Sequence, residues 1–310
     1  MNSPVPQSPL RIGTRGSRLA LAQAGLVRTA LAGRGIASEL VTVRTSGDRI
    51  QDRPLAALGG KGLFTKELED ALLKGLIDLA VHSMKDVPVL LPDGLQIVAV
   101  LAREDARDAF LSHQAGSLAE LPAGARIGTS SVRRQAQVAR ARPDLEIVSL
   151  RGNVDTRIAK LDAGEFDAIL LASAGLKRLG LQERITTPLP LESWLPALSQ
   201  GAIGVEARRE DGWVDLLSPL HDLPTAVALA CERAFQAALD GSCTTPIGGF
   251  AFYRDGILSF RGEVLAPDGS NFADTAFKTR LVESSEQHAA ALGREAGLAL
   301  KPRAAHWLAR

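Results

Sequence analysis

Short apolar runs recur over about the first two hundred residues, each followed by a small polar turn and a segment with helical spacing of apolar positions. The stretch RIGTRGSRLALAQA begins at Arg11, and the similar RIGTSSVRRQAQVA begins at Arg126. GLIDLAVHS (75–83) is echoed more faintly by GEFDAILLA (164–172), and both place Gly and Asp before an apolar strand pattern. Because strand and helix patterns alternate in both copies, they predict two similar α/β domains with parallel sheets.

The pattern changes after about residue 223. A helical pattern, TAVALACERAFQAAL, is followed by the small polar loop DGSCTTPIGG and by alternating strands with the hairpin signals RDG and PDG. A last helical pattern covers about 284–300. We therefore expect a smaller α+β domain with an antiparallel sheet at the C-terminus. The predicted domains are a discontinuous α/β domain 1 (1–102 and 202–220), α/β domain 2 (103–201) and the C-terminal α+β domain (221–310).

The polar turns of both copies fall where parallel strands end and helices begin. They are GTRGS, VRTSGD, HSMKD, GTSSVRR and LRGNVDTR. Open α/β sheets bind ligands beyond the carboxyl ends of their strands and at helix N-termini, so we expect these turns to face one cleft between the two domains. The first copy has an extra stretch rich in glycine and charge (46–64), which predicts a mobile lid loop that contains Lys61.

Composition narrows the classes of function. The 310 residues are 45% hydrophobic and 23% charged, with a formal net charge of +1. Proteins that bind nucleic acid generally carry an excess of basic residues, so this near-neutral charge argues against a nucleic-acid partner. The start of the chain lacks the pattern of a signal peptide, and no uninterrupted apolar run is long enough to span a membrane. Two cysteines without an export signal indicate a cytoplasmic protein, and the scattered histidines and absent CxxC and HExxH spacings predict no metal site.

The two cysteines occupy different patterns. Cys231 lies four residues from both Val227 and Phe235 on the apolar stripe of a helix, which predicts a buried and inert thiol. Cys243 follows a glycine helix stop and lies among Ser and Thr residues. From its position alone, Cys243 is either a reactive thiol or an ordinary loop residue.

The segment VHSMKDVP (81–88) follows a strand that should be buried, so Ser83, Lys85 and Asp86 should emerge at its cleft end. A carboxylate held there beside a cation could act as an acid, a base or an electrostatic stabiliser. The same residues could equally form an ordinary surface turn.

Arginines gather at predicted strand ends and first helical turns. They are Arg15, Arg18, Arg133, Arg134, Arg151 and Arg157. A cation at a helix N-terminus is electrostatically unfavourable unless an anion is present, and guanidinium groups bind carboxylates or phosphates in pairs. Each arginine alone is more readily explained as a solvated side chain, but the set favours a ligand with several negative charges.

These stretches together resemble the porphobilinogen deaminase (hydroxymethylbilane synthase) family. The resemblance runs from about residue 10 to the C-terminal helix, through GGKGLF, AVHSMKDVP, AREDARDAF, GTSSVRRQ, SLRGNVDTR, LASAGLKRLGL and QGAIGVE in that order. It implies a transferase that joins four porphobilinogen molecules head to tail, with loss of ammonia, on a covalently bound dipyrromethane primer. Hydrolysis then releases the linear tetrapyrrole hydroxymethylbilane. Members of this family are typically monomers.

The resemblance also implies roles for individual residues. Cys243 matches the cysteine that holds the dipyrromethane through a thioether, and Asp86 matches the catalytic aspartate. The remaining cofactor-binding matches are Ser83, Lys85, Asp86 itself, Thr129, Ser131, Arg133, Arg134, Arg151, Gly152 and Arg157. Substrate binding is implied for Arg15, Ser17, Gln23, Ser130, Arg151, Arg157 and Gln200, because each pyrrole unit carries an acetate and a propionate. Lys61 falls in the stretch that resembles the family's lid.

The main alternative is a non-catalytic protein that binds an anionic small molecule in its cleft, because the doubled α/β architecture is similar to that of periplasmic binding proteins. The missing export signal and the loop cysteine count against it.

Overall fold

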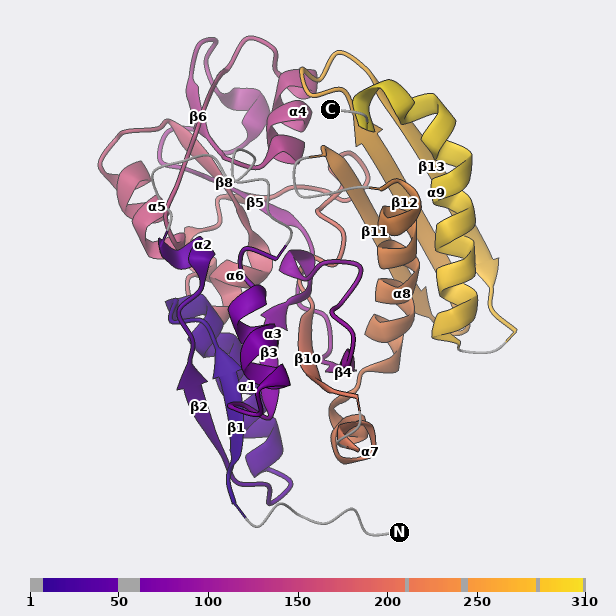
Figure 1. The fold of residues 1–310 in the computed structure, drawn as a ribbon. Helices are drawn as coiled ribbons and strands as arrows, with labels where there is room; N and C mark the ends of the chain where they lie inside the picture. Colours follow the sequence, from indigo (N-terminus) through magenta and orange to yellow (C-terminus); the bar gives the residue numbers. More distant parts are fainter. Residues whose placement is uncertain (1–7, 50–61, 210–211, 241–244, 283–284, 309–310) are drawn as a thin grey trace. The chain divides into compact units, whose positions relative to one another are not determined.

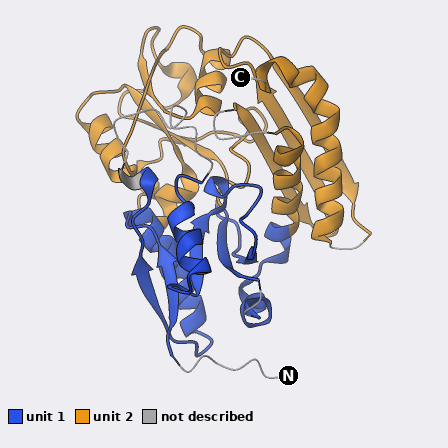
Figure 2. Ribbon diagram, in the orientation of Figure 1, with its two compact units in different colours: residues 1–53, 58–104, 202–226 blue, residues 54–57, 105–201, 227–310 orange. Residues whose placement is uncertain are grey.

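The computed structural model describes residues 8–49, 62–209, 212–240, 245–282 and 285–308. Lys61 and Cys243 therefore lie outside the described residues. The chain forms two compact units, which Figure 2 shows in different colours. Unit 1 holds the described residues up to Glu104 together with Ala202–Ala226, and unit 2 holds Asp105–Gly201 and the described residues from Val227 onward.

Unit 1 is built on a five-stranded sheet. Its elements are β1 (Leu10–Thr14), α1 (Arg18–Ala32), β2 (Ser38–Thr42), α2 (Ser46–Arg49), α3 (Lys66–Leu73), β3 (Leu79–Ser83), the 3-10 turn η2 (Met84–Asp86), β4 (Leu95–Val100), β10 (Ile203–Arg208), α7 (Trp213–Leu217) and η5 (Ser218–Leu220). The strand order is β2-β1-β3-β10-β4 (Figure 1). Alternate apolar residues such as Ile12, Leu79 and Val205 are fully buried, which fixes the face that each strand turns to the core.

Unit 2 contains a second five-stranded sheet with the order β7-β6-β8-β5-β9. Its elements are β5 (Asp108–Ser112), η3 (Leu118–Glu120), β6 (Arg126–Gly128), α4 (Val132–Ala141), β7 (Glu146–Val148), α5 (Val154–Asp162), β8 (Ala168–Ala172), α6 (Ser173–Arg178), η4 (Gln182–Arg184) and β9 (Thr187–Pro188). This order repeats that of the first sheet strand for strand, so the predicted doubling of an α/β domain is confirmed.

The prediction of parallel sheets is wrong for part of each sheet. β10 runs antiparallel to β3 and β4, and β5 runs antiparallel to β8 and β9. These are the first strands that the chain forms after it passes from one unit to the other. β10 starts beside Ser83 at the carboxyl end of β3, and β5 starts beside Ala172 at the carboxyl end of β8. A strand that starts at that edge must run back along its neighbour.

Unit 2 also holds the predicted antiparallel sheet of the C-terminal region. Its strands are β11 (Ile247–Arg254), β12 (Ile257–Leu265) and β13 (Phe272–Arg280), in that order. Figure 1 shows α8 (Leu223–Ala238) and α9 (Glu286–Leu308) side by side along this sheet. The sheets thus fall within the three predicted domains, although the second and third belong to one compact unit; the domain boundaries stay predictions.

Helix α9 is longer than the apolar pattern predicted. It continues through Pro302 to Leu308, although a proline inside a helix removes one backbone hydrogen bond. Ala304 is fully buried and Trp307 packs against the same core cluster, so the burial of this last part stabilises the extension. No described helix is both long and apolar enough to cross a lipid bilayer.

The turn between β12 and β13 lies directly on helix α4. Gly269, in this turn, has a left-handed backbone with φ of +73°, and a Cβ there would lie 2.5 Å from the backbone nitrogen of Arg140 and 2.6 Å from the carbonyl oxygen of Ala136. Only a residue without a side chain permits this contact between the antiparallel sheet and α4.

Replacing Gly269 with alanine should therefore destabilise the protein more than the same change at Gly124. Both glycines are left-handed, but nothing lies within 4 Å of a Cβ at Gly124. We expect Gly124→Ala to cost about 1 kcal/mol for the backbone conformation. Gly269→Ala should cost about 1–3 kcal/mol more because of the overlap. Urea unfolding of the two variants measures the difference, and equal losses would show that the turn does not press on α4.

Candidate active site

The turn that carries Asp86 is fixed to the sheet of unit 1 from two sides. The backbone nitrogen of Met84 donates to the carbonyl oxygen of Ala202 at 3.0 Å, and the Met84 side chain is buried. A side chain at Gly204 would overlap the Met84 sulfur, at 2.1 Å, so the glycine of QGAIGVE leaves the room that Met84 fills. Lys85 and Asp86 follow, both half-buried at the strand end as predicted.

The Asp86 carboxylate is available for chemistry. Among the described residues, none forms a hydrogen bond or ion pair with it. Next to it, the Ser83 hydroxyl contacts the buried amide of Gln23 on α1, with 2.8 Å to Nε2 and 3.1 Å to Oε1. The sequence assigned Ser83 and Gln23 to different ligands, and the structure brings them together.

The N-terminus of α1 holds two further predicted residues. Ser17 caps the helix, because its hydroxyl accepts from the backbone nitrogen of Ala20 at 3.2 Å. The Arg15 guanidinium lies 4.1 Å from the ring centroid of Phe64, which follows the predicted lid residue Lys61. A planar guanidinium can stack on an aromatic ring, so the Phe64 ring helps to hold the Arg15 side chain in place.

In unit 2, the hydroxyl groups of the turn before α4 form hydrogen bonds with nearby backbone groups. Thr129 Oγ1 accepts from the backbone nitrogen of Ser131 at 3.2 Å, and Ser131 caps α4 by accepting from the backbone nitrogen of Arg134. Ser130 donates to the carbonyl oxygen of Leu150 at 2.8 Å. These hydroxyls thus shape the turn, and any ligand would compete with these bonds.

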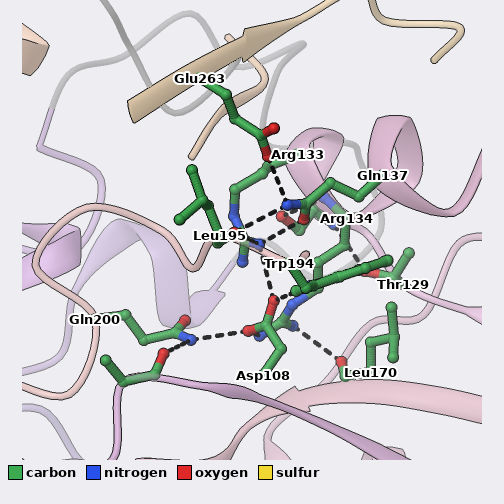
Figure 3. Close-up of polar contacts among 12 residues, drawn as sticks. Asp108, Thr129, Arg133, Arg134, Gln137, Leu170, Trp194, Leu195, Gln200 and Glu263 are labelled. Atoms are coloured by element: carbon green, nitrogen blue, oxygen red, sulfur yellow. Dashed lines mark hydrogen bonds and ion pairs between the residues drawn. The ribbon is translucent and has the colours of Figure 1, made fainter. Parts of the chain in front are cut away.

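Arg133 and Arg134 are folded inward onto a carboxylate that sequence reasoning did not single out. Figure 3 shows Asp108, at the start of β5, between them. Asp108 Oδ2 accepts from Arg133 Nη1 at 2.8 Å, and Oδ1 accepts from Arg134 Nη2 at 2.7 Å. Trp194 Nε1 donates to the same carboxylate at 2.9 Å and Gln200 Nε2 at 2.8 Å. Four side chains therefore donate hydrogen bonds to one buried carboxylate.

The charge state of Asp108 follows from these contacts. Complete burial by itself would raise the pKa of Asp108. The two guanidinium charges and their hydrogen bonds outweigh burial and hold the pKa far below the usual range for a carboxyl group. Asp108 is therefore ionised at neutral pH.

The arginines of α4 are turned into the protein, which the sequence did not predict. The side chains are only 4% and 7% exposed, and Arg134 Nη1 also donates to the carbonyl oxygen of Leu170 at 2.9 Å. Two cations nevertheless share one carboxylate, which leaves one positive charge in excess. The Nε atoms of Arg133 and Arg134 are buried without a hydrogen-bond partner. The excess positive charge favours a further negatively charged group nearby.

Gln200 is held inside unit 2 by hydrogen bonds that the sequence did not predict. Its Nε2 donates to Asp108 and, at 2.8 Å, to the carbonyl oxygen of Ala106, and the side chain is buried. The adjacent Ser199 has a left-handed backbone with φ of 63°, and its nitrogen donates to the buried carboxylate of Glu232 at 2.5 Å. The turn therefore holds Gln200 against Asp108.

The loop before α5 presents the other predicted arginines. Gly152 has φ of +110°, and a Cβ there would lie 2.8 Å from the Thr156 methyl group. The Gly152 carbonyl oxygen accepts from Arg157 Nε at 2.8 Å. Arg151 is half-buried, and none of the described residues bonds to its guanidinium. Arg151 is thus the cation of this loop that remains available for an anion.

Cys231 behaves as predicted. It is fully buried in α8, and burial together with the nearby Glu232 charge raises the pKa of its thiol. It is therefore an unreactive thiol at neutral pH. Within the described ranges, no group of His, Cys, Asp and Glu side chains is arranged to hold a metal ion.

Comparison with known proteins places these residues in a family. The description "Porphobilinogen deaminase, dipyromethane cofactor binding domain" matches residues 10–215, and "Porphobilinogen deaminase, C-terminal domain" matches residues 226–302. The chain belongs to the porphobilinogen deaminase family. Porphobilinogen deaminases of Nitrobacter winogradskyi and Nitrobacter hamburgensis are each 55% identical over 298 residues, covering 94% of this chain and 93% of theirs. That of Syntrophobacter fumaroxidans is 51% identical over 294 residues, 94% of each chain.

Solved structures similar to this member of the family include a periplasmic substrate-binding protein of an ABC transporter from Coxiella burnetii. It is 15% identical, covers 72% of this chain and 96% of its own, and gives a TM-score of 0.43. The methionine-binding protein MetQ is 17% identical, with 66% and 86% coverage and a TM-score of 0.42. The predicted fold class, two α/β domains and an antiparallel C-terminal sheet, is confirmed by the sheets themselves.

Sequence reasoning missed Asp108, although the residue lies in AREDARDAF, one of the stretches that resemble the porphobilinogen deaminase family. The available signal was a charged residue at the start of a strand that is otherwise apolar, since a fully buried aspartate needs partners. The two arginines of GTSSVRRQ were its possible partners, but nothing in the sequence pairs them with Asp108.

Replacing Asp108 with asparagine should destabilise this porphobilinogen deaminase in a pH-dependent way. The change leaves two buried guanidinium groups without a counter-charge, which typically costs about 3–5 kcal/mol. Because the folded-state pKa of Asp108 is depressed, its contribution is fully present above the unfolded pKa of about 3.9 and is lost as the pH falls below that value. The gap between wild type and variant should therefore be widest near neutrality and shrink below about pH 4.

Asp144→Asn is the matched control, because Asp144 pairs with an arginine, Arg142, but at the surface. Urea unfolding at several pH values measures both variants. A loss at Asp108 that is as small as that at Asp144, or that does not change with pH, would contradict the role given to the buried carboxylate.

Proposed function

We propose that this chain is a hydroxymethylbilane synthase. It joins four porphobilinogen molecules head to tail with loss of ammonia, and hydrolysis releases the linear tetrapyrrole. The observation that carries the proposal is the match of both porphobilinogen deaminase domains, in order, over nearly the whole chain. A non-catalytic binding protein is not favoured, because relatives at 55% identity carry the enzyme's name.

Cys243 is the proposed attachment point of the dipyrromethane cofactor. The support is the contrast with Cys231, whose buried thiol with a raised pKa is a poor nucleophile. When bound, the dipyrromethane supplies the pyrrole position to which the first substrate unit is joined. A thiolate suits the attachment because it is a soft nucleophile and its carbon–sulfur bond can persist through many turnovers.

Asp86 is the proposed catalytic residue. Its carboxylate stands on a rigid turn, has no partner among the described residues, and follows Lys85 directly. A protonated carboxyl group in this position can give a proton to the departing amino group of the substrate, and the carboxylate that remains can stabilise positive charge on the pyrrole ring. It can then accept the proton that the ring loses after coupling.

The arginines are proposed to bind the acetate and propionate groups. Arg151 and Arg15 have donors suited to this task, and Arg133 and Arg134 supply the excess positive charge beside Asp108. The roles of Thr129, Ser130, Ser131, Gly152 and Arg157 are proposed on the same basis, as are those of Ser17, Gln23, Ser83 and Lys85 and the lid position of Lys61. For Gln200 we propose a role through Asp108, since its amide is committed to that carboxylate.

The partner of the chain on this proposal is porphobilinogen. We further propose that it acts as a monomer in the cytoplasm. The free, buried Cys231 fits a reducing compartment, where structural disulfides are rare.

Activity is tested by incubating the purified protein with porphobilinogen and measuring released ammonia and tetrapyrrole. An enzyme releases ammonia continuously, in amounts far above the protein concentration. Binding of porphobilinogen in a stoichiometric amount, without ammonia release, would favour the non-catalytic alternative.

Replacing Cys243 with serine should abolish both cofactor attachment and activity, because a serine hydroxyl is a much poorer nucleophile than a thiolate. Intact mass spectrometry should show the native protein heavier than its sequence by one dipyrromethane unit, and the Cys243→Ser variant without that addition. Cys231→Ala is the matched control: it should keep the added mass and lose only stability, from a small core cavity. A modification that maps to Cys231 would overturn the assignment.

Replacing Asp86 with asparagine should reduce turnover by about 100-fold or more, because the variant keeps the shape of the side chain but cannot transfer a proton or carry the charge. The added cofactor mass and the unfolding midpoint should remain, since the carboxylate forms no hydrogen bond or ion pair with a described residue. Asp93→Asn, an exposed acid in the following loop, serves as control and should leave the rate unchanged. Near-normal turnover in a folded Asp86→Asn protein would remove Asp86 from the mechanism.

A further inference from the structure

We propose that Glu263, on strand β12, is a positioning residue for Arg133 and acts through the amide of Gln137. The inference rests on the proposed function, in which Arg133 contributes to binding a pyrrole carboxylate. It adds a residue of the C-terminal sheet to the machinery that prepares the arginines of α4.

The Gln137 amide is held in one orientation by its partners. Its Nε2 donates to Glu263 Oε1 and to the carbonyl oxygen of Leu195, both at 2.9 Å. Its Oε1 is thereby turned toward Arg133 and accepts from Nη1 at 2.7 Å. If the Gln137 amide were rotated by 180°, its NH₂ group would face the Arg133 guanidinium, and two hydrogen-bond donors would oppose each other. Because Gln137 is only 1% exposed, water could not satisfy these donors.

Glu263 is the partner that allows only one of the two orientations of the Gln137 amide. A carboxylate can only accept when ionised, so it binds the NH₂ end of the amide and rejects the oxygen end. The Leu195 carbonyl has the same preference, but it also accepts from Arg133 Nη1 at 2.8 Å and is therefore shared. Figure 3 shows the resulting chain from Glu263 through Gln137 to Arg133 and Asp108.

Glu263 is itself held where it can act only on α4. It is 5% exposed, and its other oxygen accepts from Arg140 Nη1, one turn further along α4, at 3.1 Å. Arg140 in turn lies over the ring of Phe272, with 4.6 Å to the centroid. The buried Glu263 carboxylate thus accepts from Gln137 and Arg140, which are three positions apart and lie on the same face of α4.

The register of the antiparallel sheet connects Glu263 to the strand that follows the cysteine loop. Gly248 on β11 is paired with Glu263, and a Cβ at Gly248 would lie 3.2 Å from Glu263 Oε1 and 3.1 Å from the Leu195 side chain. The glycine therefore leaves the space that Glu263 occupies. Gly248 is five positions after Cys243, so the strand that follows the proposed attachment loop also packs against the group that orients Gln137.

The test compares Glu263→Met, Gln137→Met and the double variant, because methionine keeps the volume but offers no strong donor or acceptor. Two quantities are measured: the fraction of purified molecules with the covalent cofactor mass, and KM with kcat per loaded molecule. Each single variant should lower the loaded fraction and raise KM roughly tenfold, the size expected for one hydrogen bond to a charged group, with kcat unchanged. The double variant should be no worse than Gln137→Met alone.

Conservative and control variants separate positioning from simple support of the fold. Glu263→Gln keeps an oxygen that can accept from Gln137, so it should restore most of the loaded fraction and KM. If Glu263→Met does not fold, the cycle is run with Glu263→Gln, whose smaller effect should vanish when Gln137 is already methionine. Asp274→Asn, the exposed cross-strand neighbour of Glu263, should change neither quantity.

Arg133→Ala distinguishes failure of the inference from failure of the proposed function. If Arg133→Ala leaves loading and KM unchanged, the proposed role of Arg133 is wrong and the inference falls with it. If Arg133→Ala impairs both but Glu263→Met impairs neither, only the inference is overturned. Effects of Glu263→Met and Gln137→Met that simply add in the double variant would also overturn it, since Glu263 would then not act through Gln137.

Discussion

The buried carboxylate of Asp108 is the contact on which much of unit 2 depends. It ties the first strand of the unit to helix α4 through Arg133 and Arg134, to the segment before β10 through Gln200, and to the apolar core through Trp194. Buried cations of this kind are tolerable only when a counter-charge holds them. Asp108 therefore allows α4 to bury two arginine side chains, and it also orients their hydrogen-bond donors.

Each unit holds a charged group that its described neighbours do not fully compensate. Unit 2 keeps two guanidinium groups around one acid, with an excess of positive charge, whereas unit 1 keeps Asp86 on a turn whose carboxylate no described residue neutralises. Fixed, incompletely compensated charges are what binding of carboxylates and stabilisation of a cationic ring require, because they need no rearrangement when the ligand charge arrives. The fold supplies the rigidity: a strand end for Asp86, and a capped first helical turn for the arginines.

The hydrophobic pattern predicted the doubled α/β unit, the hairpins of the last sheet and the buried Cys231, because each of these follows from local periodicity or turn chemistry. It could not predict the antiparallel direction of β5 and β10, since alternation of apolar residues carries no strand direction. It also ended α9 too early, because burial of Ala304 is a tertiary contact that outweighs the local effect of Pro302. The arginines were found at the right positions, but their acceptor lies 25 residues away in sequence, so local position could not show that they turn inward.

The close approach of α9 to α8 has a consequence for the redox chemistry of the protein. A Cβ at Gly293 would lie 2.1 Å from the Cys231 carbonyl oxygen, so the two helices leave no space beside this residue, and its thiol is both buried and protonated. Oxidants in solution attack thiolates that they can reach, and Cys231 offers neither the thiolate nor the access. Of the two cysteines, only Cys243 would then be open to oxidation. If Cys243 is bound in a thioether, as proposed, the protein with its cofactor attached would have no thiol that an oxidant can attack.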